Sequence, residues 1–592
     1  MSIVIFFLAF ARKPVYTTPS MKNDAYATED SKTALKRKIG QMLAIGFPSG
    51  AEGMASLRHV VEATFAGNVI LFSRNTPDAE ATRSTVAQLS SIIESATGFA
   101  TLVAIDQEGG IVARLRKGVT PLPGAMAQAA ACMGGNAELG DIEKLGKVCG
   151  RELAALGILW NLAPVADVNI NPKNPVIGVR SYGEDPYRVG EFASAFARGL
   201  RESGVVATAK HFPGHGDTSI DSHLDIPLVP HELERLEKVE LLPFKRLIAE
   251  NIPAIMTAHV RFPAVEPDLL PATLSARVLE GLLRRDMGFE GIICSDCMEM
   301  RAITDHFPNP YVMAVKAGVD ILFISHTAER QIEAADSIYR AVLDGEIPES
   351  RIDASVSRIL ACKQSYRGNA GDSASEDGLE MGQEAFDLAN RISRGSLTIL
   401  RRGDARDFRK PDEGGLLIDL APANITGAED AADLPSIASR LDRRDAAWFS
   451  RKLPIDPSTG EIAEVMDYAH STLEQGFSAR LGDVGVAAGA AKIGAKPAIA
   501  LSLIAPLLHK GQIELLIQCA RLAGKMKTRL CVALMRSPYD AAGIAELCVR
   551  EAGVEPMIIA AYEYTDLSAE SMAGFLAGEF EARGVCPVTL PS

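Results

Sequence analysis

The chain has 592 residues, of which 47% are apolar and 23% are charged, as in an ordinary globular protein. This length exceeds what one compact core holds, so we expect two domains or more. Its 61 basic and 75 acidic residues give a net charge of −14, which argues against a general nucleic-acid binder, because phosphate binding needs a basic face.

An apolar run at residues 3–11 opens the chain. The run is too short to span a bilayer. A secretory signal would have basic residues before the run, whereas Arg12 and Lys13 come after it. We therefore expect residues 1–32 to be a disordered or dispensable extension of a cytoplasmic protein with no stable insertion into a membrane, although the run leaves export open.

Eight apolar, β-branched runs alternate with amphipathic segments between residues 42 and 324. Unalternated hydrophobic strands separated by helices are typical of a parallel sheet that is buried on both faces. Eight strand–helix alternations predict an α/β fold with a (β/α)8, TIM-like barrel over residues 33–365. The predicted strands are 42–47, 68–72, 101–105, 157–168, 205–209, 254–258, 291–294 and 319–324.

Polar residues stand directly after these strands. In a (β/α)8 barrel such positions all face the same mouth. Their convergence predicts a binding or catalytic site there. The residues are Arg74, Asn75, 106–108, Asp167, Lys210, His211, His259, Asp296 and His326.

A polar, glycine-bearing stretch at 366–382 predicts a linker, and a second α/β pattern occupies 383–592. Apolar strands alternating with helices predict a smaller α/β sandwich domain. No G-x-G-x-x-G motif follows a strand there, so a nucleotide site has little support. The predicted strands are 397–400, 416–420, 498–503, 530–535 and 556–560.

The nine cysteines are scattered, and most stand in apolar runs, which indicates buried thiols rather than a disulfide framework. Cys294 and Cys297 form a C-x-x-C pair. A redox or zinc site is the less favoured interpretation of this pair, because no second pair lies nearby.

The densest group of polar residues is Lys210-His211-Phe212-Pro213-Gly214-His215-Gly216-Asp217, followed by Asp221-Ser222-His223. Asp221 and His223 are two residues apart, so an extended segment puts both side chains on one side. The carboxylate can then fix the tautomer of the ring while the other ring nitrogen handles a proton. A solvated loop with an Asx-turn is the alternative.

The same histidines, with Asp217 and Asp225, offer ligands that suit zinc or iron. There is no H-x-H on a first strand and no H-E-x-x-H motif, so metal catalysis is disfavoured. We expect no metal and no cofactor.

Asp296 ends the seventh predicted strand, where a carboxylate points into the mouth of the barrel and can attack or stabilise an oxocarbenium centre. A helix N-cap is an equally good interpretation of Asp296 alone. Asp106 can accept from vicinal hydroxyls, or form a structural ion pair. Five residues converge on one mouth of the predicted barrel, and ligand contact is therefore the favoured interpretation for them. They are Asp106, Arg114, Arg180, Lys210 and His211.

At this point the motifs resemble a known family. The stretch from Lys210 to Thr218 with Asp221-Ser222-His223 resembles the signature of family 3 glycoside hydrolases of the β-N-acetylhexosaminidase type. Further matching motifs, in the order of that family and of its two-domain members, are 71–75, 106–110, 180–186, 271–275, 288–291, 537–540, 561–562 and 587–591.

The resemblance implies a retaining exo-β-N-acetylglucosaminidase that acts on glycans, in bacteria on peptidoglycan fragments (muropeptides), without a metal. It implies that Asp296 is the nucleophile, His223 the acid/base and Asp221 its partner. The five residues named above for ligand contact would then bind the terminal N-acetylglucosamine. The chain departs from the family pattern at Ile111, where arginine is common, and at Cys297, where a second aspartate is common.

Three alternatives stay open. The first is a β-glucosidase-like hydrolase of the same family, a type that draws its acid/base glutamate from outside the barrel loop. The second is a phosphorylase that cleaves N-acetylglucosaminides. The third is a non-catalytic sugar-binding protein.

Overall fold

The computed structural model describes residues 30–220, 225–373, 382–403, 414–421, 429, 436–444, 448–474 and 497–591. Within these residues, eight parallel strands close into a barrel in the order β1-β10-β9-β8-β7-β6-β3-β2. The predicted barrel is confirmed, because each predicted apolar run contains or overlaps one strand. The strands are β1 (Leu43–Ile45), β2 (Asn68–Leu71), β3 (Leu102–Ile105), β6 (Trp160–Asn161), β7 (Val206–Phe212), β8 (Ala254–Thr257), β9 (Ile292–Cys297) and β10 (Ile321–Ile324).

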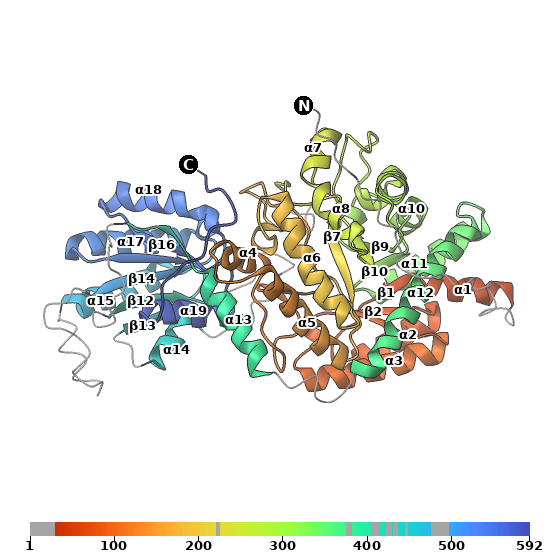
Figure 1. Ribbon diagram of the computed structural model, residues 1–592, viewed down its shortest axis with the longest axis horizontal. Helices are drawn as coiled ribbons and strands as arrows, with labels where there is room; N and C mark the ends of the chain where they lie inside the picture. Colours follow the sequence, from red (N-terminus) through yellow and green to blue (C-terminus); the bar gives the residue numbers. More distant parts are fainter. Residues whose placement is uncertain are drawn as a thin grey trace, which may run out of the picture.

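Helices surround the barrel and occupy the chain between successive strands (Figure 1). Helix α6 shows how the sequence sets a helix start: the Asp185 side chain accepts from the N–H groups of Tyr187 and Arg188, and Pro186 stands at the first turn. The helical segments after the strands are α2 (Gly50–Thr64), α3 (Ala79–Thr97), α4 (Ala125–Met133), α5 (Leu139–Ala155), α6 (Pro186–Glu202), α7 (Leu233–Lys238), α8 (Leu241–Ala249), the π-helix η5 (Arg277–Asp286), α9 (Arg301–Thr304), α10 (Pro310–Ala317) and α11 (Ala328–Leu343).

Two further helices, α1 (Ser31–Gln41) and α12 (Glu349–Ser373), lie against each other and close the amino-terminal end of the barrel. Buried Lys363 of α12 donates to Gln41 Oε1 and to the carbonyl of Gly67, which stand just before β1 and β2. Helix α12 runs into the segment that we expected to be a linker, and α1 begins inside the expected extension. The remaining parts of both segments, 1–29 and 374–381, lie outside the described residues.

The second domain contains a sheet with the strand order β11-β16-β15-β14-β12-β13, in which only β11 is antiparallel to its neighbour among the described pairings. The predicted barrel-plus-α/β architecture is therefore confirmed. The strands are β11 (Thr398–Arg401), β12 (Gly415–Leu420), β13 (Trp448–Leu453), β14 (Ala498–Leu503), β15 (Leu530–Leu534) and β16 (Met557–Ala560); the helices are α13 (Gln383–Ser396), α14 (Ile437–Asp442), α15 (Thr459–Glu474), α17 (Lys510–Met526), α18 (Ala541–Ala552) and α19 (Asp566–Leu576).

The two domains share a hydrophobic cluster that lies close to α4 (Figure 1). Ile111 and Met126 of the barrel are buried in it with Tyr562 of the second domain. Beside the cluster, the carboxylate of Glu563 accepts from the backbone N–H of Gly124 at 2.5 Å and from the hydroxyl of Thr565 at 2.9 Å. The barrel mouth and the second domain are thus held in one arrangement by apolar packing and a buried carboxylate.

Burial raises the pKa of Glu563 from its ordinary value of 4.5 to about 7. A folded-state pKa above the unfolded value means that stability falls as the pH rises from 4.5 to 7, here by about 3 kcal/mol. We expect Glu563→Gln to flatten this decline, because an amide can keep both hydrogen bonds without ionising. Denaturant unfolding from pH 4.5 to 8 measures the effect. Exposed Glu555→Gln is the control, and an unchanged slope in Glu563→Gln would contradict the prediction.

No helix among the described residues is long and apolar enough to cross a membrane.

Candidate active site

A cavity of about 520 Å³ opens at the carboxyl ends of the barrel strands. Its walls come from β7, from the segments after β2, β3, β6, β9 and β10, and from Glu429 of the second domain. This volume is in the range of small-molecule sites. The cavity brings together six of the residues that we predicted as site residues, namely Asp106, Arg114, Arg180, Lys210, His211 and Asp296.

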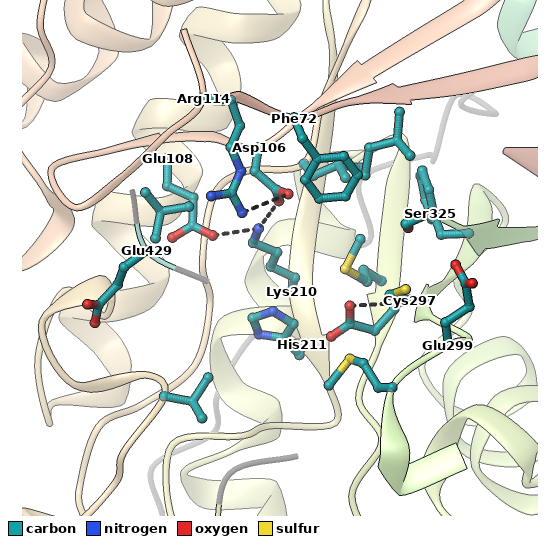
Figure 2. Close-up of a pocket in the computed structure, with 18 of the residues that line it drawn as sticks. Phe72, Asp106, Glu108, Arg114, Lys210, His211, Cys297, Glu299, Ser325 and Glu429 are labelled. Carbon is teal, nitrogen blue, oxygen red and sulfur yellow. Dashed lines mark hydrogen bonds and ion pairs between the residues drawn. The ribbon is translucent and has the colours of Figure 1, made fainter. Parts of the chain in front are cut away.

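A buried network of charges forms one wall of the cavity (Figure 2). The ammonium group of Lys210 lies between two carboxylates, 2.8 Å from Asp106 Oδ1 and 2.6 Å from Glu108 Oε1. Arg180 binds Glu108 in a bidentate pair at 2.8 and 2.9 Å, and Arg114 Nη2 lies 3.6 Å from Asp106 Oδ2. The network keeps Asp106, which is 15% exposed, oriented at the cavity surface.

The charges in this network hold each other ionised. Burial alone would raise the pKa of Glu108, but Arg180 and Lys210 outweigh burial and hold that pKa well below its usual range. Burial alone would lower the pKa of Lys210, yet Asp106 and Glu108 keep it above its ordinary value. The cavity wall therefore offers a fixed cation and fixed carboxylate oxygens at neutral pH, which is the donor and acceptor set that sugar hydroxyls need.

His211 is positioned by a buried carboxylate, Asp167. The two oxygens of Asp167 accept from the backbone N–H of His211 and of His215, and Oδ2 lies 2.7 Å from His211 Nδ1. This contact presents the opposite ring nitrogen of His211 toward the cavity. Burial would raise the pKa of Asp167, but His211 and His215 lower it below its ordinary value.

His215 lies behind His211, with the two rings edge to face at 5.9 Å. Burial, with the nearby His211, lowers the pKa of His215 to about 4, so its ring is neutral at pH 7. Its Nδ1 lies 2.9 Å from the hydroxyl of Thr218. His215 therefore links the cavity to the start of the segment that continues to residue 225.

Asp296 stands near the end of β9 and is only partly buried. Its Oδ1 accepts from the backbone N–H of Cys297 at 2.7 Å. The helix N-cap interpretation fails, because the residue that precedes α9 is Met300. A carboxylate that faces a cavity of sugar-sized volume from a rigid strand can reach a reacting carbon held there.

The model of the N-terminal domain of glycosyl hydrolase family 3 matches residues 34–362, which is more than half of the chain. The chain belongs to glycosyl hydrolase family 3.

Curated relatives of this family 3 chain are named β-hexosaminidases. The protein from Methylococcus capsulatus is 39% identical over 266 residues, which cover 45% of this chain and 77% of the relative. β-Hexosaminidase A from Pseudoalteromonas piscicida is 39% identical over 273 residues, but the match covers only 45% of that longer relative. The predicted resemblance to family 3 enzymes of the β-hexosaminidase type is confirmed.

Similarity to a solved structure extends over both domains. A family 3 β-N-acetylglucosaminidase from Paenibacillus sp. str. FPU-7 superposes with a TM-score of 0.81 at 34% identity. The superposition covers 94% of this chain and 99% of that protein. The second domain is therefore shared with that relative and is not peculiar to this family 3 chain.

Asp221 and His223 lie outside the described residues. The chain that leads up to them is anchored, however. Asn174 Nδ2 donates to the carbonyl of His215, and Asn171 Nδ2 donates to the carbonyl of Thr218. The segment that carries Asp221 and His223 therefore starts beside a residue that lines the cavity.

Other polar residues at the barrel mouth either bind backbone groups next to the cavity or line more of its wall. Asn75 accepts from the N–H of Phe72 and donates to the carbonyl of Phe47, and His259 lies 3.0 Å from the carbonyl of Cys297. Arg74 and His326 line the cavity, where both pack on the ring of Phe72. Phe72 lies next to Asp106 and Arg114 in Figure 2, and the Arg114 guanidinium also faces its ring, so this aromatic group adjoins the charge network.

Three residues had no individual predicted role. Glu108 and Asp167 were predicted only as members of the polar set that follows the strands; both turn out to position groups in the cavity. Glu429 comes from the second domain and lines the cavity, with its carboxylate bound by Arg536 at 2.6 Å and by the hydroxyl of Tyr564 at 2.5 Å. Nothing in the local sequence around Glu429 indicates such a role.

The two departures from the family pattern have different surroundings. Ile111 is buried in the cluster between the domains, where an aliphatic side chain packs well. Cys297 lines the cavity, and burial raises the pKa of its thiol to about 11, so it stays protonated near neutral pH. All nine cysteines are free, six of them buried, and the C-x-x-C pair forms no disulfide.

Proposed function

We propose that this family 3 protein is a retaining exo-β-N-acetylglucosaminidase that removes terminal N-acetylglucosamine from β-linked glycans. The observation that carries the proposal is the joint presence of Asp296, Lys210 and His211 in one cavity, beside the anchored start of the segment that holds His223. The names of the curated relatives and of the Paenibacillus structure support the acetamido sugar.

In the first step, an oxygen of Asp296 attacks the anomeric carbon while His223 protonates the glycosidic oxygen. The bond to the leaving group breaks, and an ester links the sugar to Asp296. In the second step, His223 takes a proton from water, and the water oxygen attacks the anomeric carbon. The ester then breaks, which returns the Asp296 carboxylate and releases the sugar with its original β configuration.

A histidine in the acid/base role has a physical advantage. A second carboxylate near the anionic nucleophile would have its own pKa raised by repulsion. A neutral imidazole in the second step lets water approach the ester without that repulsion. We assign Asp221 the task of holding the tautomer of His223, as Asp167 does for His211.

We assign the charge network to recognition of the terminal sugar. Asp106 accepts from ring hydroxyls, and Lys210, Arg114 and His211 donate to oxygens of the sugar, with Arg180 fixing Glu108 behind them. Glu429 of the second domain lines the Glu108 side of the cavity (Figure 2) and limits its length there, which favours cleavage at a chain end. Peptidoglycan fragments as substrates and a cytoplasmic location belong to the same proposal.

The configuration of the first product tests the function. With an aryl β-N-acetylglucosaminide in an NMR tube, we expect β-N-acetylglucosamine to appear first and the α-anomer to follow by mutarotation. Phosphate should leave the product unchanged. Release of the α-anomer first, formation of a sugar 1-phosphate, or faster cleavage of the aryl glucoside than of the acetamido sugar would each contradict the proposal.

A further inference from the structure

We propose that Asp217, His231 and Glu240 form a zinc-binding site at the edge of the barrel, outside the active-site cavity. One ligand atom from each of the three residues lies within 4.8 Å of the others. None of the three lines the cavity described above. The inference concerns metal binding alone and does not depend on the proposed function.

The three residues come from separate places in the chain and meet because of the fold. Asp217 lies after β7, His231 lies before α7, and Glu240 immediately precedes α8. The Nε2 atom of His231 is in close contact with Asp217 Oδ2. The side chains of Asp217 and His231 are 20% and 31% exposed, so an ion can reach the pair from solvent.

Glu240 gives the second, independent observation. Its side chain is 2% exposed, and its Oε2 accepts from Arg235 Nη1 at 2.8 Å. Its other oxygen, Oε1, is buried and has no hydrogen-bond partner in the part of the chain that the structure describes. A buried polar atom without a partner is costly and needs a cause. A bound cation satisfies that oxygen.

The backbone around Glu240 holds the carboxylate in place. Gly214 has a φ of +141°, and a Cβ added there would lie 2.9 Å from the Cβ of Glu240. Only glycine lets the segment after β7 pass this close to the start of α8. The close approach brings Asp217, three residues further along, to Glu240.

The donor set favours zinc. Zinc accepts imidazole nitrogen and carboxylate oxygen together, with three protein ligands and a water in a tetrahedron. Its bonds are about 2.0–2.2 Å long, so side-chain rotation must draw the three ligand atoms inward from their present separation. Ca²⁺ and Mg²⁺ instead prefer six or more oxygen ligands.

Such an ion would connect residues on both sides of one segment. Asp217 precedes residues 218–230, whereas His231 and Glu240 follow them. A metal that binds all three ligands adds a crosslink around this segment. Because the ion binds the folded chain, it raises thermal stability, and the increase grows with the logarithm of the zinc concentration relative to its Kd.

Equilibrium dialysis of the full chain against Zn²⁺, after removal of metals with a chelator, tests the site. We expect the wild-type protein to bind one Zn²⁺ per chain at this site. The His231→Gln and Glu240→Gln variants should each bind one Zn²⁺ fewer. The affinity should fall at least about tenfold in each variant, because even the loss of a group behind a ligand costs 10–100-fold. Zn²⁺ should also raise the melting temperature of the wild-type protein but not of the two variants. Excess Mg²⁺ should not displace the bound Zn²⁺.

His470→Gln is the matched control, because His470 also pairs with a carboxylate, Glu474, at 3.1 Å on the outer face of helix α15. This variant should bind zinc like wild type. Equal zinc uptake by wild type and His231→Gln would overturn the proposal. Loss of the zinc in His470→Gln, or retention of it in Glu240→Gln, would overturn it as well. Glu240→Gln also decides the question should His231→Gln fail to fold.

Discussion

Replacing Asp296 by alanine is expected to lower kcat on an aryl β-N-acetylglucosaminide by about 10⁴-fold or more, the loss seen when a nucleophilic group is removed. The physical reason is that the other carboxylates that line the cavity among the described residues are held by partners. Glu299 accepts from the backbone N–H groups of His326 and Thr327, and Glu429 is bound by Arg536 and Tyr564. Asp106 and Glu108 are both committed to Lys210. Initial rates with a chromogenic substrate measure the effect.

Azide separates loss of the nucleophile from loss of the fold. In Asp296→Ala, the truncated side chain leaves room beneath the sugar, and an azide ion can attack the anomeric carbon from that face. The product expected is the α-glycosyl azide, because only one inversion takes place. Exposed Asp286→Ala, which removes a surface pair with Arg285 outside the cavity, should keep wild-type turnover. Near wild-type turnover by Asp296→Ala would refute the assignment.

The barrel could be predicted from sequence because its signal is local. Each parallel strand is buried on both faces, so it reads as an uninterrupted apolar run. The fourth run was the least accurate, since 157–168 contains only β6, Trp160–Asn161. Pro164 has no N–H to give to a neighbouring strand, so regular pairing ends before it, and one isolated pairing follows at Val165.

Strand β13 of the second domain was not predicted, because its sequence lacks the apolar run that identifies the barrel strands. It lies at the edge of the sheet, and Ser450, Arg451 and Lys452 make it half-exposed. An edge strand with polar side chains has no continuous apolar run to detect. No strand was therefore predicted at this position.

The shared cavity of six candidate residues could be predicted, but their partners could not. The rule that strand ends share one mouth placed Asp106, Lys210 and Asp296 together. The pairing of Lys210 with both Asp106 and Glu108 joins residues about a hundred positions apart, which no local pattern specifies. The same limit applies to Glu429, because only the packing of two domains brings it to the cavity.

His223→Gln is expected to separate good from poor leaving groups. For a disaccharide such as chitobiose, kcat/KM should fall by 10²–10⁴-fold, the usual contribution of a general acid. For a dinitrophenyl β-N-acetylglucosaminide, kcat/KM should change little, because that leaving group departs without a proton. Since kcat/KM reports the steps up to formation of the glycosyl-enzyme, the comparison isolates the acid role.

The base role of the same side chain predicts a further signature. Without His223, water attacks the glycosyl-enzyme slowly, so the dinitrophenyl substrate should give a burst of phenolate followed by a low steady rate. His326→Gln is the matched control, because His326 lines the same cavity beside Phe72 and has no assigned proton transfer. Equal losses of kcat/KM on both substrates in His223→Gln would place the acid elsewhere. The carboxylate of Glu429, supplied to the cavity by the second domain, would then be the residue to replace next.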